Sequence, residues 1–160
     1  MNQKYTNFQL ISLVTLRVLI GWHLLYEGLA KLTNPFWSAT NYLQQSNWSI
    51  FNSLSANSGL LSIIDIMTIW GLILAGFLLI AGLFTRSATI AAAVLLFLFY
   101  IAHPPLIGWE SNLPTEGNYL IINKTIIEVV ALFVLYVFPS GRFFGLDLFL
   151  SGLTTGKKEN

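Results

Sequence analysis

Cysteine is absent from this 160-residue chain, and charged side chains are scarce. Without cysteine, the chain alone can form no disulfide, thiolate metal site or iron–sulfur centre. Only 9% of its residues are Asp, Glu, Lys or Arg, against about 25% in an average soluble domain. No basic run exists beyond Lys157 and Lys158, so the sequence gives no reason to expect nucleic-acid binding. So few charges could not cover the surface of a soluble protein of this size.

Apolar residues are abundant instead: they make up 55% of the chain and gather in long runs. A hydrocarbon core of about 30 Å needs about 20 helical residues, and four runs reach or approach that length. The third run ends at Pro104, because the residue before a proline is pushed out of the α region. We predict an all-α, integral membrane four-helix bundle that forms one domain over residues 1–160. Its helices are expected over residues 9–31, 63–84, 87–103 and 119–138.

Lysine and arginine flank the predicted helices on one side only, which predicts the orientation. Lys4 precedes the first helix, Arg86 lies between the second and third, and Arg142 follows the fourth. The loops 33–62 and 104–118 contain neither residue type. We therefore expect a multi-pass protein of the cell (inner) membrane with both termini in the cytoplasm. The apolar stretch that starts at Arg142 is too short to span and should lie along the inner interface.

Ionisable residues interrupt the first and fourth predicted helices. At 100° per residue the first helix places its polar side chains on one stripe, with neighbours spaced i,i+4. This stripe consists of Arg17, His23, Glu27 and Lys31. The fourth helix repeats the pattern with Lys124 and Glu128 at i,i+4, beside Asn123. We expect the two stripes to face each other and to converge on the outer leaflet.

A charge near the bilayer centre costs about 2.5–3.5 kcal/mol, so we expect these side chains either to form ion pairs with one another or to serve a function. One interpretation is an ion-pair network that fixes the helix register, with Glu27 bound to Lys31 or Lys124 and Glu128 to the other lysine. The functional interpretation starts from charge, because Arg17 and the two lysines outnumber the two glutamates by one. A site with one surplus positive charge would hold a small anion or stabilise the negative charge of a reduced quinone.

The two histidines are weaker candidates for a role in the chemistry of this site. His23 would act as a quinone hydrogen-bond partner or proton carrier, or else is a packing residue satisfied by a neighbouring carboxylate. His103 is expected at the membrane interface, without a chemical role. A bis-histidine haem would need both at one depth, which the predicted helix limits do not give. We predict no haem and no metal.

Several motifs, in order along nearly the whole chain, together resemble the DoxX/DoxD family. They are Arg17 in the first helix, GWHLLYEGLAKL (21–32), GLFTR (82–86), YIAHPP (100–105), TEGNYLIINKTIIE (115–128) and GLD (145–147). The 115–128 block is the most specific of them. The resemblance implies a four-helix bundle and a relationship to the membrane subunit of thiosulfate:quinone oxidoreductase.

Two functions follow as hypotheses. The first is a quinone-reactive membrane subunit of an oxidoreductase that oxidises a small sulfur anion such as thiosulfate, with quinone as electron acceptor. Proton transfer would then fall to His23, Glu27 and Glu128, and substrate binding to Arg17, Lys31, Asn123 and Lys124. The alternative is a non-catalytic module that anchors or assembles a partner complex. Both functions require the lipid bilayer. Both also require a partner, which is either a membrane or extracytoplasmic protein or a second copy of this chain. A small-solute transporter ranks last, because four helices without a repeat rarely supply two access states.

Overall fold

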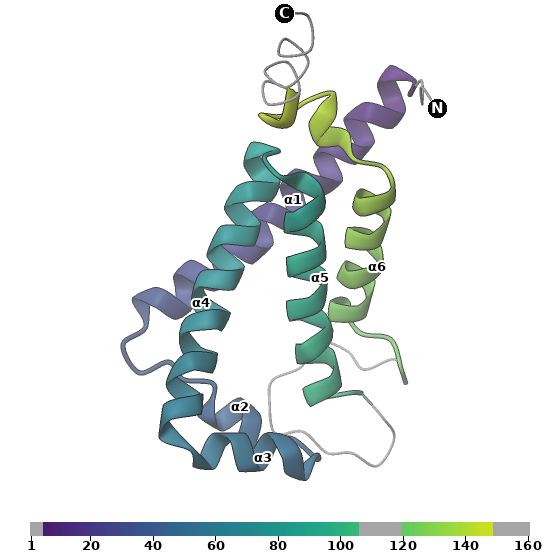
Figure 1. Cartoon of the computed structure of the whole chain (residues 1–160). Helices are drawn as coiled ribbons and strands as arrows, with labels where there is room; N and C mark the ends of the chain where they lie inside the picture. Colours follow the sequence, from purple (N-terminus) through teal and green to yellow (C-terminus); the bar gives the residue numbers. More distant parts are fainter. Residues whose placement is uncertain (1–4, 106–119, 149–160) are drawn as a thin grey trace, which may run out of the picture.

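The structure is a computed structural model, and it describes residues 5–105 and 120–148 (Figure 1). The elements within these ranges are all helical. They are α1 (Asn7–Thr33), α2 (Thr40–Gln44), α3 (Ser49–Ala56), α4 (Ser58–Ala81), α5 (Thr85–Ala102), α6 (Lys124–Val137) and the 3-10 turn η1 (Ser140–Arg142). The all-α prediction is therefore confirmed for the described part of the chain. The predicted loop 104–118 and the end of the interfacial segment fall largely outside it.

Three helices, α1, α4 and α5, are long and apolar enough to cross a membrane. Large apolar side chains on their outer faces are exposed, among them Trp22, Trp70 and Phe97. A lipid bilayer is the solvent that such faces require. Helix α6 has only 14 residues, which corresponds to a length of about 21 Å. The fourth crossing, and the cytoplasmic placement of both termini, stay predictions.

The helix ends differ from the predicted limits for local reasons. Helix α6 begins at Lys124 rather than near residue 119, because Asn123 has extended backbone angles and its side chain accepts a hydrogen bond from the Ile126 amide. Helix α4 ends at Ala81 rather than at residue 84, because Gly82 takes the left-handed conformation with φ 65°. The polar loop 33–62 was not expected to hold helices, but it contains α2, α3 and the start of α4.

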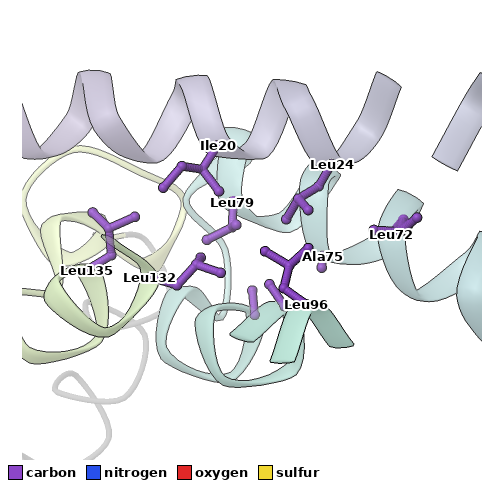
Figure 2. Packing of buried hydrophobic residues seen from close by; sticks show 10 residues of the cluster. Ile20, Leu24, Leu72, Ala75, Leu79, Leu96, Leu132 and Leu135 are labelled. Carbon is purple, nitrogen blue, oxygen red and sulfur yellow. The ribbon is translucent and has the colours of Figure 1, made fainter. Parts of the chain in front are cut away.

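The helices pack around one apolar core, and α1 lies closest to α4. A Cβ atom on Gly76 of α4 would come within 2.5 Å of the Leu25 amide nitrogen and 2.6 Å of the Gly21 carbonyl oxygen, so only glycine allows this approach. Figure 2 shows leucine, isoleucine and alanine side chains from all four long helices pointing into one shared space. This core holds α1, α4, α5 and α6 together and leaves their two ends for polar groups.

Those two ends are distinct regions of the molecule (Figure 1). We call the region of α2, α3, the last turn of α5 and the first turn of α6 the loop end. We call the region of the first turns of α1, the turn between α4 and α5, and η1 the terminal end. The candidate site lies toward the loop end.

Candidate functional site

A cavity of about 480 Å³ lies among α1, α2, α4, α5 and α6. Its apolar wall includes Leu24, Leu72, Leu96 and Phe99. Its polar wall includes His23, Glu27, Lys31, His103, Asn123, Lys124 and Glu128. Six of the seven predicted site residues therefore line one cavity. An apolar hollow with a few convergent polar groups is the usual form of a small-molecule site.

The two predicted stripes meet across this cavity. Nδ1 of His23 on α1 lies 2.8 Å from Oε1 of Glu128 on α6, and both side chains are partly exposed. The two atoms form an ion pair when the imidazole is protonated, and the carboxylate favours a proton on Nδ1. Nε2 is then the atom of His23 that can take up a further proton. A histidine oriented by a carboxylate is an arrangement suited to proton transfer.

A second ion pair lies on α1 alone. Nζ of Lys31 is 2.5 Å from Oε2 of Glu27, one helical turn earlier, and 5.7 Å from the centre of the Trp37 ring. The predicted pairing of Glu27 with a lysine is therefore confirmed. The predicted pairing of Glu128 with the other lysine stays a prediction, and the structure gives Glu128 a further partner in His23, which reaches it across the bundle.

The first turn of α6 supplies the remaining predicted residues. Asn123 caps the helix by accepting a hydrogen bond from the Ile126 amide at 3.0 Å, and Lys124 is the first residue of the helix. Both line the cavity next to the His23–Glu128 pair. Because α6 begins at Lys124, these two residues lie at its N-terminal end, which borders the cavity.

Arg17 does not belong to this site, although the helical stripe predicted that it would. It is only 3% exposed and lies at the terminal end, where Nη1 donates to Ser140 Oγ at 3.3 Å and Nη2 to the Phe144 carbonyl at 2.8 Å. This position also corrects the expected charge. Among the described lining residues the two lysines balance the two glutamates, so the predicted surplus of positive charge is not present there.

His103 and Tyr42 also line the cavity, although neither was predicted to belong to it. Nε2 of His103 lies 2.5 Å from the Tyr42 carbonyl oxygen. Burial lowers the pKa of the His103 imidazole below its ordinary value of 6.5, and the carbonyl contact opposes that shift only in part. His103 is therefore neutral near pH 7, with its proton on Nε2. Burial also raises the pKa of the Tyr42 hydroxyl, which stays protonated.

The short helix α2 is held over the cavity by hydrogen bonds from two neighbouring helices. The Ala39 amide donates to Oδ1 of Asp65 on α4 at 2.8 Å. The Tyr42 hydroxyl donates to the Phe99 carbonyl at 2.8 Å, and Ser46 Oγ to the Ala102 carbonyl at 2.6 Å. These two carbonyls belong to the last turn of α5, and the Phe99 carbonyl also accepts from the His103 amide at 3.3 Å. No local pattern in the sequence predicts these hydrogen bonds, because their partners lie far apart along the chain.

No group of three or more His, Asp or Glu side chains is placed to hold a metal ion in residues 5–105 and 120–148. The protein-family model described as DoxX matches residues 12–104, which is more than half of the 160-residue chain. This match includes α5 and its end at His103 but not α6, so Lys124 and Glu128 lie beyond it. No curated protein and no solved structure matches the chain.

Proposed function

The chain belongs to the DoxX family, and on that premise we propose that it is the quinone-reactive membrane subunit of an oxidoreductase. The membrane setting is supported by three apolar helices of spanning length. The proposal adds a fourth crossing through α6, both termini in the cytoplasm, and residence in the inner membrane. In this orientation the loop end faces the outer leaflet.

The observation that carries the proposal is the His23–Glu128 pair on the wall of the cavity. Reduction of a quinone to a quinol consumes two electrons and two protons, so a quinone site needs a proton donor close to a quinone oxygen. His23 protonated on both nitrogens donates one proton from Nε2, Glu128 stabilises the imidazolium through Nδ1, and water that reprotonates His23 supplies the second proton. Leu24, Leu72 and Leu96 give the cavity an apolar wall against which the quinone ring can pack.

The ammonium groups at the cavity have a separate task. Negative charge builds on the quinone oxygens as electrons arrive, and a cation in a low-dielectric site stabilises it strongly. Glu27 and the Trp37 ring hold the Lys31 ammonium in place, and Lys124 lines the same hollow. Asn123 places the first turn of α6, and Lys124 with it, at the cavity. Arg17 has no part in this chemistry, because its position is at the other end of the bundle.

We place the oxidation of a small sulfur anion such as thiosulfate on a partner subunit rather than in this cavity. The balanced charge of the described lining residues does not favour an anion. The link to thiosulfate rests on the sequence resemblance to the membrane subunit of thiosulfate:quinone oxidoreductase. Electrons would reach the quinone from a membrane or extracytoplasmic partner that binds the anion.

A second function, a non-catalytic module that anchors a partner complex, is favoured by one observation. Both glutamates of the cavity already have a partner within the chain, Glu27 in Lys31 and Glu128 in His23. Paired charges of this kind also fix helix register without any ligand. This function predicts that changes at the pair lower abundance and partner recovery together.

Quinone reduction in native membranes tests the proposal. We expect thiosulfate-dependent reduction of a short-tailed ubiquinone analogue in membranes that contain the chain, and its loss in membranes that lack the chain. Restoring the chain from a plasmid should restore the rate. Equal rates in both kinds of membrane would refute the proposed reaction. Rates that follow the recovery of the partner, with no quinone bound by the purified chain, would favour the anchoring module.

The orientation has its own test, because the chain has no cysteine and is ready for single-cysteine labelling. Ser58 and Ser87 are exposed and lie at opposite ends of the α4–α5 hairpin. In intact cells, Ser58→Cys should react with a membrane-impermeant thiol reagent and Ser87→Cys should not. Reaction of Ser87→Cys alone would reverse the orientation. Reaction at both would show that α4 does not cross the membrane.

A further inference from the structure

Three rings gather on one side of the cavity, and they come from α2 and from α5 and its C-terminal cap. The Tyr42 ring centre lies 5.9 Å from that of Phe99 at an interplanar angle of 69°, and 4.2 Å from that of His103 at 64°. All three residues line the cavity. The two ion pairs are on α1 and α6 instead. The cavity therefore has an aromatic wall and a charged wall.

The aromatic wall is fixed by hydrogen bonds and not by packing alone. The Tyr42 hydroxyl donates to the Phe99 carbonyl, and the Tyr42 carbonyl accepts from Nε2 of His103. Asp65 binds the amide of Ala39, one residue before α2, and so ties this wall to α4 as well. These bonds restrain the Tyr42 ring through its hydroxyl and the His103 ring through Nε2, beside the Phe99 ring.

A fixed wall of rings favours one class of ligand. Aromatic rings attract other rings edge-to-face or in offset stacks by about 0.5–1.5 kcal/mol beyond the burial of apolar area. A sulfur anion or an aliphatic chain gains nothing comparable from such a surface. A quinone has both a flat ring and oxygens at its edge, which matches an aromatic wall beside a charged one.

We propose that Tyr42 and Phe99, positioned by His103, form a ring-binding subsite that holds the flat head group and directs its oxygens toward the His23–Glu128 and Glu27–Lys31 pairs. This inference rests on the proposed quinone function and adds the residues that select the ring. Tyr42 and Phe99 contact the ring. His103 and Asp65 are positioning residues, since they act by holding α2.

The test measures dissociation constants of a short-tailed naphthoquinone and a short-tailed benzoquinone for the purified full chain in detergent. Phe99→Leu removes one ring from the subsite and should weaken binding by roughly 2-fold to 12-fold, with the larger loss for the two-ring naphthoquinone. Phe97→Leu is the matched control. It makes the same change on the same helix, but the Phe97 side chain is exposed on the outer face, so binding should not change.

Tyr42 supplies an independent pair of variants. Tyr42→Phe keeps the ring and loses the hydroxyl, so quinone affinity should stay close to that of the wild-type chain. Tyr42→Leu loses the ring and should weaken binding as Phe99→Leu does. Thermal melting and size-exclusion chromatography identify any variant that fails to fold. If a variant at one position fails, the variants at the other position, Phe99 or Tyr42, test the subsite.

The outcomes separate the two proposals. If the wild-type chain binds quinone and neither Phe99→Leu nor Tyr42→Leu weakens it, the ring-binding subsite is wrong and the quinone function stands. Equal losses in Phe97→Leu and Phe99→Leu would also overturn the subsite. If the wild-type chain binds neither quinone, the proposed function fails first and the subsite fails with it.

Discussion

The two ends of the bundle both hold ionisable side chains, but they surround them differently. At the terminal end, Arg17 donates to Ser140 Oγ and to the Phe144 carbonyl. Asp147 accepts from the Phe84 amide at 2.7 Å, and from both the amide (3.0 Å) and the hydroxyl (2.6 Å) of Thr85. These bonds tie the segment after α6 to α1 and to the start of α5.

Two backbone segments meet closely at the terminal end, where the structure gives a hollow of only about 150 Å³ with an almost wholly apolar lining. A Cβ atom on Gly145 would come within 2.7 Å of the Gly82 carbonyl oxygen, and one on Gly82 within 2.8 Å of the Gly145 Cα. Two segments far apart in the sequence therefore touch through their glycines. Arg17 and Asp147 bind backbone and hydroxyl groups of the chain itself, and Arg86 lies over the Tyr136 ring.

The loop end combines similar residue types with a hollow. His23 and Glu128 meet across α1 and α6, and Lys31 meets Glu27, but these pairs border a cavity of about 480 Å³. Their side chains line this cavity, so a ligand in it would lie beside them. Arg17 and His23 lie on the same stripe of α1, but Arg17 is enclosed by packed chain whereas His23 borders the cavity.

The largest expected effect is on turnover at the loop end. His23→Gln keeps an amide that can donate to Glu128 but removes the group that carries a proton. Loss of a general acid lowers turnover by about 100-fold or more, so quinone reduction should fall by that factor at unchanged abundance. Assays in membranes normalised to the amount of chain by immunoblot measure this. Trp22→Leu, which changes the exposed neighbour, serves as the control. Proportional falls in abundance and rate would assign His23 to the scaffold.

The second effect concerns stability at the terminal end. Arg17→Leu leaves Ser140 Oγ and the Phe144 carbonyl without their donor, and such losses cost on the order of 2–5 kcal/mol together. We expect a lower melting temperature and lower abundance, with the quinone dissociation constant of the remaining folded protein unchanged. Thermal melting and quinone titration of the purified variant measure both quantities. A large loss of quinone affinity in a stable variant would return Arg17 to the site.

The smallest expected effect is a pH dependence of the protein's stability, which comes from His103 beside α2. Since burial lowers the pKa of His103 in the folded protein, the unfolded chain takes up this proton more readily than the folded one. Stability is then complete above the unfolded pKa of about 6.5 and declines as the pH falls toward the lower folded pKa. His103→Gln keeps a donor for the Tyr42 carbonyl and does not titrate.

Melting curves at about pH 7.5 and about pH 5.5 bracket that transition. The wild-type chain should lose more stability between the two values than His103→Gln does. Parallel losses in the two proteins would show that His103 is not the group whose protonation loosens α2.

The sequence predicts the apolar helices well, because length and hydropathy are local properties. It also predicts that His23 and Glu128 face each other, since helical periodicity places each on a definite face. Periodicity gives the direction of a side chain but not what lies beside it. Arg17 shares the stripe of His23, and only the return of the chain at Ser140 and Phe144 makes it part of the terminal end.

The missed features depend on contacts between distant residues. Helix α2 lies in a polar segment without periodic apolar residues, and its place follows from hydrogen bonds of Ala39 to Asp65 and of Tyr42 to Phe99. His103 was expected at the interface because it stands at the end of an apolar run. Its contact with the Tyr42 carbonyl brings it to the cavity wall, and no pattern near His103 indicates that partner.

Photoaffinity labelling tests the central claim most directly, because it reports where on the chain a quinone lies. The purified full chain is irradiated with an azido-quinone, and the labelled peptides are identified by mass spectrometry with and without excess unlabelled quinone. We predict competable labels on cavity-lining residues of the loop end, in the peptides that contain Tyr42, Phe99 or Glu128. Competable labels confined to the terminal end around Arg17, or no competable label at all, would contradict the account.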